Sequence, residues 1–202
     1  MMSLLGTILS AVIFAELAGY VIHVVLHSQK IEYLSRNHMI HHLVVYGPTM
    51  PQRPGESYLN SVGDRSAVLG IGMEWILPIL ILLSIIVGAF EFLGIGSTYL
   101  FVFIGSALGW GYFLFGYMHD NMHLKNFWMT THPLTKNWFL HIRKMHDIHH
   151  LYVDESGKMN CNYGICFFGF DRIFGSYKTR IHGVNREGVA KALEKYKFIF
   201  PQ

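Results

Sequence analysis

Charge is scarce in this sequence, and it is unevenly placed. Only 14% of the 202 residues are charged, whereas 51% are hydrophobic. No lysine or arginine occurs before Lys30, and none occurs between Arg65 and Lys125. The basic residues form no dense stripe, which argues against a nucleic-acid-binding protein. With only two cysteines, Cys161 and Cys166, the sequence also lacks a disulfide framework, and we expect both to be reduced thiols.

Hydrophobic residues, by contrast, are bunched into three long segments. A membrane-spanning helix needs about 20 mostly apolar residues, and we expect spans at about 3–24, 68–93 and 98–118. The alternative interpretation is that these segments are three buried helices of a soluble domain, which would have similar lengths. The positions of lysine and arginine decide between the two, because three spans place both basic segments on one side of a bilayer. This is the positive-inside pattern, and it favours a membrane protein.

The whole chain, 1–202, is predicted to form a single all-α domain with an integral membrane part and a cytoplasmic part. The cytoplasmic part comprises 25–60 and 119–182, and the tail is expected to carry an amphipathic helix at 186–197. The first span lacks a basic n-region and an Ala-x-Ala cleavage site. We therefore expect it to be retained rather than removed as a signal peptide.

Ten of the thirteen histidines fall into four tight clusters near the ends of the first and third spans. Residues three and four apart share one face of a helix, so each cluster can point two or three imidazoles at a common spot. Imidazole suits iron, zinc, copper or nickel. One ion takes about four to six ligands, so ten imidazoles suit a pair of metal ions. The candidate ligands are His23, His27, His38, His41, His42, His119, His123, His146, His149 and His150.

The topology predicts that these clusters meet beneath the membrane surface, since the first and third spans exit on the same face. The order of a span, His-xxx-His and His-xx-His-His occurs twice, which suggests two similar halves that contribute five histidines each. Three histidines stand alone and are expected to be ordinary interfacial residues, with His141 the nearest to a cluster. They are His132, His141 and His182.

Acidic residues near the clusters could accept a hydrogen bond from the second ring nitrogen of a metal-bound imidazole. Asp120, Asp147 and Asp171 are the candidates for this second shell, and ordinary surface carboxylates are the alternative. Glu16 and Glu74 lie within the apolar segments, where a carboxyl group is costly and usually faces other helices. Each either lines a substrate path or packs against a polar partner.

The order and spacing of the clusters resemble the signature of the fatty acid hydroxylase and sterol desaturase superfamily of integral-membrane, non-haem diiron enzymes. That signature reads His-x3-4-His, His-x2-3-His-His, His-x3-His, His-x2-3-His-His. A second likeness follows the last cluster, where 162–164 reads Asn-Tyr-Gly and 170–176 reads Phe-Asp-Arg-Ile-Phe-Gly-Ser. These segments are similar to the superfamily's Asn-Phe-Gly and Trp-Asp-Arg-Leu-Phe-Gly-Thr, with Phe170 in place of tryptophan. The resemblance extends from about residue 20 to 180.

The resemblance implies two iron ions held by the ten histidines, with zinc as an alternative occupant in purified protein, and dioxygen as co-substrate. It implies hydroxylation or desaturation of an unactivated C–H bond in a fatty acyl or sterol-like membrane lipid. No haem domain is fused to the chain, so electrons would come from a separate donor protein. Asp171 and Arg172 would have a structural role. Many members have four spans, so a fourth stays open here, and the long interval before His146 leaves His132 or His141 as substitute ligands.

Two other functions compete with this one. Small bacterial carotenoid hydroxylases are histidine-rich relatives, so a carotenoid ring is the second substrate class. A membrane metal transporter would place histidines or acids near the bilayer midplane, and a haem carrier would pair axial histidines between facing helices. Here the clusters lie at the ends of the spans, which favours lipid oxidation. The sequence leaves the substrate, the regiochemistry and the redox partner open.

Overall fold

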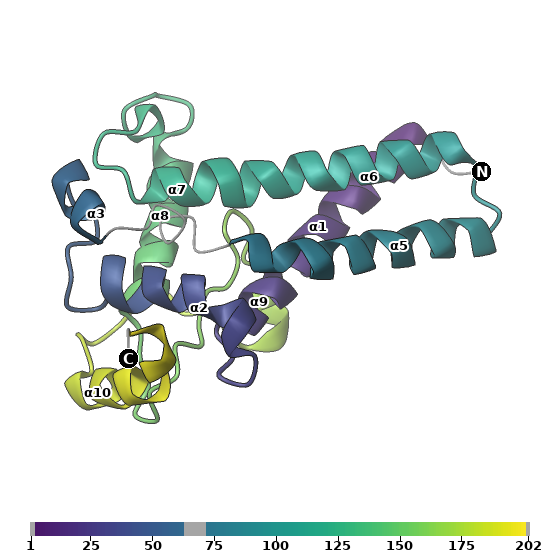
Figure 1. Ribbon diagram of the computed structural model, residues 1–202. Helices are drawn as coiled ribbons and strands as arrows, with labels where there is room; N and C mark the ends of the chain where they lie inside the picture. Colours follow the sequence, from purple (N-terminus) through teal and green to yellow (C-terminus); the bar gives the residue numbers. More distant parts are fainter. Residues whose placement is uncertain (1–2, 63–71, 201–202) are drawn as a thin grey trace.

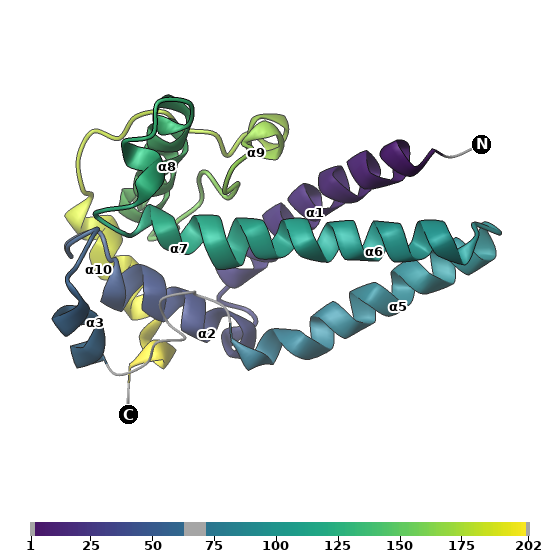
Figure 2. The same cartoon turned by 90° about the horizontal axis from the view of Figure 1, so that it is seen from above.

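The computed structural model describes residues 3–62 and 72–200, and these residues form helices and loops without any β-strand. Figure 1 shows three long helices that run side by side toward one end of the molecule. Shorter helices gather at the other end, where the chain also terminates. The turned view in Figure 2 shows the same two parts. The predicted all-α architecture is therefore confirmed.

Three helices of the described chain are long and apolar enough to cross a membrane. The first matches the span expected at 3–24, and the third matches that expected at 98–118. The first four residues of the span expected at 68–93 lie outside the described residues, and the remainder is helical from Met73 to Phe92. No fourth helix of this kind occurs in 3–62 or 72–200. The spans are α1 (Leu4–Leu26), α5 (Ile76–Phe92) after a 3-10 turn at Met73–Trp75, and α6 (Ser97–Gly111), which continues through a π-helix (Tyr112–Met118) into α7 (His119–Met122).

Helix α1 packs closely against α6 and its π-helical continuation. The backbone of Gly19 lies so near the ring of Phe115 that an added Cβ would stand 2.8 Å from the ring. The rings of Phe14 and Phe103 meet at 5.5 Å between centroids. Between them, the indole of Trp110 donates a hydrogen bond of 2.9 Å to the carboxyl group of Glu16. A polar pair inside an apolar bundle satisfies both groups and fixes the two helices against one another.

The remaining helices form the part that lies beyond the spans. Helix α2 passes directly into a second π-helix, and its backbone bond from Tyr46 N to His41 O spans five residues. The amphipathic helix expected at 186–197 is present as α10. The elements are α2 (Glu32–Ile40), a π-helix (His41–Val45), α3 (Glu56–Val62), a 3-10 turn (Trp128–Thr130), α8 (Lys136–Leu151), α9 (Gly169–Phe174), α10 (Arg186–Lys195) and a final 3-10 turn (Lys197–Ile199).

Two hydrophobic cores hold this part together. One packs α8 against the π-helix that follows α6, with Met118, Phe139 and Met145 at its centre. The other packs α2 against α10, with Met39 and Ala192 fully buried. The histidine-bearing helices α2, α7 and α8 are therefore fixed by apolar packing on their outer sides. The polar, histidine-bearing faces of these helices therefore point toward one another.

Candidate metal centre

Ten imidazoles gather in two groups near one end of the spans. Each of the ten side chains is at most 8% exposed. Within each group the potential ligand atoms lie within 4.8 Å of one another. These are the ten histidines singled out from the sequence. Group A consists of His23, His27, His38, His42 and His149, and group B consists of His41, His119, His123, His146 and His150.

The two groups divide each three-histidine cluster between them. His38 and His42 are four residues apart and belong to group A, whereas His41 belongs to group B. On α8, His149 belongs to group A, whereas His146 and His150 belong to group B. Two imidazoles of each three-histidine cluster therefore share one group, as expected, and the third belongs to the other group. Adjacent residues of a helix point about 100° apart, so His41 and His42 cannot share a target.

Each half of the chain nonetheless supplies five imidazoles, four to one group and one to the other. The two groups are in contact, because each contains one histidine from the other half of the chain, His41 in group B and His149 in group A. The rings of His42 and His150, one from each group, stack with centroids 4.0 Å apart and planes within 8°. Two sites in such contact are more suitable for a pair of ions that act together than for two ions that act independently.

Burial disfavours the charged form of His38, His146 and His149. It lowers the pKa of His149 to about 4, and it lowers the pKa of His38 and His146 well below the ordinary value. Neighbouring imidazoles lower the pKa further, because a second positive charge nearby is unfavourable. A neutral imidazole carries the lone pair with which histidine binds a metal ion.

Two backbone carbonyl groups determine the tautomer of histidines in group A. Nδ1 of His23 lies 2.6 Å from the carbonyl oxygen of Tyr163, and Nδ1 of His149 lies 2.6 Å from that of Cys161. A carbonyl oxygen only accepts, so Nδ1 carries the proton in both rings. The Nε2 atoms of both rings are buried and have no hydrogen-bond partner among the described residues. An orphaned ring nitrogen backed by a carbonyl acceptor is the arrangement of a metal-binding histidine.

The distances within the groups also fit an ion. Nε2 of His27 and Nε2 of His38 lie 3.0 Å apart in group A, and Nε2 of His123 and Nε2 of His146 lie 3.0 Å apart in group B. Bonds of about 2.0–2.1 Å from two such atoms to one ion would meet near a right angle. The donor sets therefore fit transition-metal ions, for which imidazole is a preferred ligand.

Asp171 stabilises the loop that carries the carbonyl groups of Tyr163 and Cys161. Its fully buried carboxylate accepts hydrogen bonds from Tyr163 N at 2.7 Å, Gly164 N at 2.8 Å and Ser176 Oγ at 2.7 Å. The neighbouring Arg172 lies over the ring of Tyr177 at 4.2 Å. Asp171 thus contacts the loop and not the imidazoles, and it acts on His23 only through the Tyr163 carbonyl.

Asn162 anchors the same loop from its other side. It is fully buried and adopts a positive φ of 50°, a conformation that asparagine tolerates better than most residues. Its amide donates to the carbonyl oxygens of Met145 and Lys178 and accepts from Lys178 N. The Asn-Tyr-Gly segment is therefore tied both to α8 and to the chain beyond α9.

The other two carboxylates considered for the second shell lie elsewhere. Oδ1 of Asp120 is 3.7 Å from Nδ1 of His119, which is beyond hydrogen-bond length. Both oxygens of Asp147 accept from Arg53 at 2.8 Å. This pair joins α8 to the loop after the π-helix His41–Val45. The direct acceptors that the structure shows for the ring nitrogens are backbone carbonyl groups, which sequence reasoning missed.

Histidines outside the clusters, and both cysteines, stay outside the two groups. His132, His141 and His182 are exposed, so neither His132 nor His141 replaces a member of either group. The cysteines form no disulfide, and burial raises the pKa of the Cys161 thiol to about 12. A protonated thiol is a poor metal ligand.

Sequence reasoning also missed two tyrosines. The ring of Tyr46 stacks on that of His123 with centroids 3.8 Å apart, and the ring of Tyr163 meets that of His27 edge-on at 5.4 Å. Both are buried. The position of Tyr46, four residues after a cluster, was the available signal. These rings form walls of the two groups and exclude water from them.

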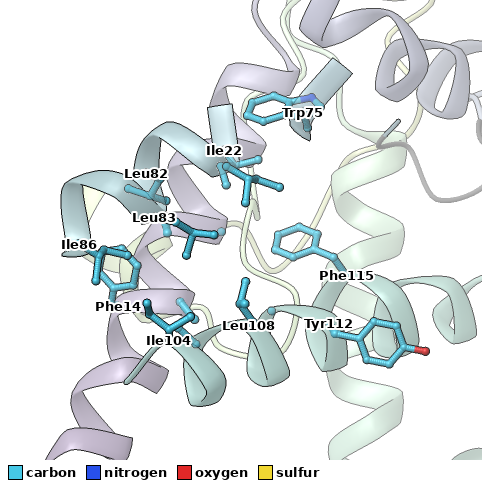
Figure 3. A pocket seen from close by; sticks show the side chains of 16 residues that line it. Phe14, Ile22, Trp75, Leu82, Leu83, Ile86, Ile104, Leu108, Tyr112 and Phe115 are labelled. Carbon is cyan, nitrogen blue, oxygen red and sulfur yellow. The ribbon is translucent and has the colours of Figure 1, made fainter. Parts of the chain in front are cut away.

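An apolar pocket of about 250 Å³ lies between α1, α5 and α6. Figure 3 shows Ile22, Leu83 and Leu108 pointing into it, with Phe115 at one side. The ring of Phe115 also contacts that of His23 in group A, at 6.3 Å between centroids. The pocket therefore reaches from the spans to the edge of group A.

The two carboxyl groups in the apolar segments do not line this pocket. Glu16 accepts the hydrogen bond from Trp110, and Glu74 accepts hydrogen bonds from the Asn37 side chain and from Gly72 N. Each carboxyl group therefore packs against a polar partner, as one of the two alternatives foresaw.

Comparison with known proteins identifies a family. Residues 8–176 match the family model described as fatty acid hydroxylase. Searches of curated proteins and of solved structures give no match. The matched range covers more than half of the chain and contains all ten clustered histidines. The chain therefore belongs to the fatty acid hydroxylase family.

Proposed function

We propose that this protein is a membrane-bound, dioxygen-dependent oxidoreductase that hydroxylates or desaturates an unactivated C–H bond of a fatty acyl or sterol-like lipid. The observation that carries the proposal is the contact between the apolar pocket and group A through Phe115. An apolar substrate in that pocket would place its chain beside Phe115, whose ring contacts that of His23. The family match supports the same class of substrate.

The ten histidines would hold two iron ions, one in each group. Bound iron would supply the activation of dioxygen. The chain's own contribution is to disfavour protonation of His149, to orient His23 and His149 through the carbonyl groups of Tyr163 and Cys161, and to exclude water. Low water content protects a reactive centre from side reactions.

The pocket favours a lipid over a metal ion as the transported or reacting molecule. Its walls are hydrophobic side chains of three candidate spans. His23 and His119 lie near the ends of their spans rather than at mid-length, whereas a transporter binds its cargo near the midplane. A lipid chain could enter the pocket sideways from the bilayer, without crossing water.

We further propose that the spans cross a membrane with the metal centre on the cytoplasmic side, where the lysine and arginine residues are concentrated. Electrons would come from a separate donor protein on that side. Hydroxylation with dioxygen consumes two electrons and two protons for each oxygen atom inserted, and the second oxygen atom leaves as water.

The experiment compares two substitutions on helix α8. We expect His149→Ala to abolish formation of oxygenated lipid and to lower bound iron, because His149 belongs to group A. His141→Ala is the matched control, since His141 is exposed on the same helix. Both variants are produced in a lipid-containing host, and lipids are profiled by mass spectrometry with ¹⁸O₂. Full product formation by His149→Ala would contradict the proposal, and the product itself would distinguish an acyl chain from a carotenoid.

A further inference from the structure

A second, smaller pocket opens on the opposite side of α1. It has a volume of about 210 Å³, and Lys30, Lys158 and Lys195 stand around it. Its floor includes the buried residues His27 and Tyr163, which belong to or adjoin group A. The pocket therefore lies against the metal centre without being part of the substrate pocket.

The geometry of α1 separates the two pockets. Ala15 lines the apolar pocket, and Val24 lines the lysine-bearing one. Nine residues correspond to about two and a half turns of an α-helix, so the two residues lie on opposite faces. A single lipid in the apolar pocket would not reach the lysines. An occupant of the second pocket would therefore be a different molecule.

The lysines of this pocket form no ion pairs among the described residues, although Asp154 lies near enough to Lys158 to interact with its charge. The three lysines come from the turn after α1, the segment before the Asn-Tyr-Gly loop and the end of α10. None of them forms an ion pair with a described residue, and the nearby Glu194 is paired with Lys197 instead. Three positive charges around one concave site attract an anion. The exposed amides of Gln29 and Asn160 add hydrogen-bonding groups.

The position of the pocket indicates where the anion would come from. Helix α1 ends at Leu26, and Val24, which is 38% exposed, is on the pocket's rim. The end of a spanning helix lies at the depth of the lipid headgroups, and basic residues there interact with anionic lipids. A cavity of this size accommodates a phosphate group but not a protein element.

We infer that this pocket binds a phosphoryl anion, and that the anion is the headgroup of an anionic membrane lipid. The bound headgroup joins Lys30 to Lys158 and Lys195 and thereby closes the outer wall over His27. The inference uses the placement of α1 in a membrane. It does not depend on iron or on the oxidation reaction, so its test can fail or succeed independently of the proposed function.

The experiment measures binding to the purified protein in a neutral detergent. Dioleoyl phosphatidylglycerol, dioleoyl phosphatidylcholine or inorganic phosphate is added, native mass spectrometry counts retained lipid, and thermal unfolding is recorded. We expect one tightly retained phosphatidylglycerol and a higher Tm with it than with phosphatidylcholine. In the variant that combines Lys30→Gln, Lys158→Gln and Lys195→Gln, affinity should fall about fivefold per lysine, on the order of 100-fold in total.

A second triple variant serves as the matched control. Lys125, Lys136 and Lys144 are exposed, lie outside the pocket and carry the same charge, so changing them to glutamine should leave retention unchanged. Equal losses in both triple variants would overturn the inference, as would retention of phosphatidylglycerol by the pocket variant. Stabilisation by inorganic phosphate, without preference for phosphatidylglycerol over phosphatidylcholine, would overturn the lipid source. Binding of an acidic ferredoxin that the pocket variant alone loses, with lipid retention unchanged, would replace the lipid by a protein partner.

Discussion

Asp171→Asn should loosen the metal centre although Asp171 touches none of the ten histidines. The substitution keeps the size of the side chain and replaces one carboxylate oxygen by an NH₂ group. Since Tyr163 N and Gly164 N bind different oxygens, one backbone N–H loses its acceptor in either orientation of the amide. A hydrogen bond to a charged group contributes about 1.5–3 kcal/mol, and the remaining bonds also weaken.

We therefore expect the free energy of unfolding to fall by about 2–4 kcal/mol. The loop would move the Tyr163 and Cys161 carbonyl groups away from His23 and His149. Loss of such acceptors typically weakens metal binding by about 10–100-fold. The assay is a chelator competition on iron-loaded protein in detergent, combined with thermal unfolding followed by tryptophan fluorescence.

The control is the same substitution at Asp147, which lies between two clustered histidines. Its carboxylate pairs with Arg53, and both side chains are partly exposed, at 29% and 23%. A pair of this kind contributes about 0–1 kcal/mol, so Asp147→Asn should change metal retention little. Equal metal loss in both variants would refute the assignment of loop support to Asp171. It would favour a direct role for Asp147 instead.

Three further predictions concern the spans and the buried imidazoles. Phe115→Ala removes the ring between the apolar pocket and His23. Product analysis should then show a shift in the position of oxidation along the lipid chain. An unchanged product would exclude Phe115 from positioning the substrate. Trp110→Phe leaves Glu16 without its donor, which should cost about 1–3 kcal/mol and lower the Tm, and an unchanged Tm would contradict this. The metal-free protein should lose stability as the pH falls from about 6.5 to 4. In this range His149 is protonated in the unfolded chain but stays neutral in the folded protein, where its pKa is about 4. His149 alone contributes up to about 3 kcal/mol, and a flat dependence of Tm on pH would exclude this effect.

Much of the architecture could be predicted from the sequence because it rests on local properties. Long apolar segments specify spanning helices whatever surrounds them, and the observed helices at Leu4–Leu26 and Ser97–Met122 match the expected spans closely. Spacings of three and four residues identified the ten histidines for the same reason, since helical periodicity is local. The tail motif also pointed to Asp171 as a structural residue.

What the sequence could not supply were the contacts between distant segments. The carbonyl acceptors behind His23 and His149 are backbone groups, which have no sequence signature. The ion pair of Arg53 with Asp147 joins residues 94 positions apart, and the two pockets form only where helices meet. None of these features follows from periodicity or composition.

The division of the histidines shows the boundary between the two kinds of information. The sequence by itself predicted that ten imidazoles would meet beneath the membrane surface, and that each half of the chain would contribute five. Only the tertiary structure decided that His42 joins group A while His41 joins group B, and that His149 crosses to group A from α8. The reason is that a helix sets only the angle between neighbouring side chains, about 100°. Which group each side chain enters depends on the helix that packs opposite it.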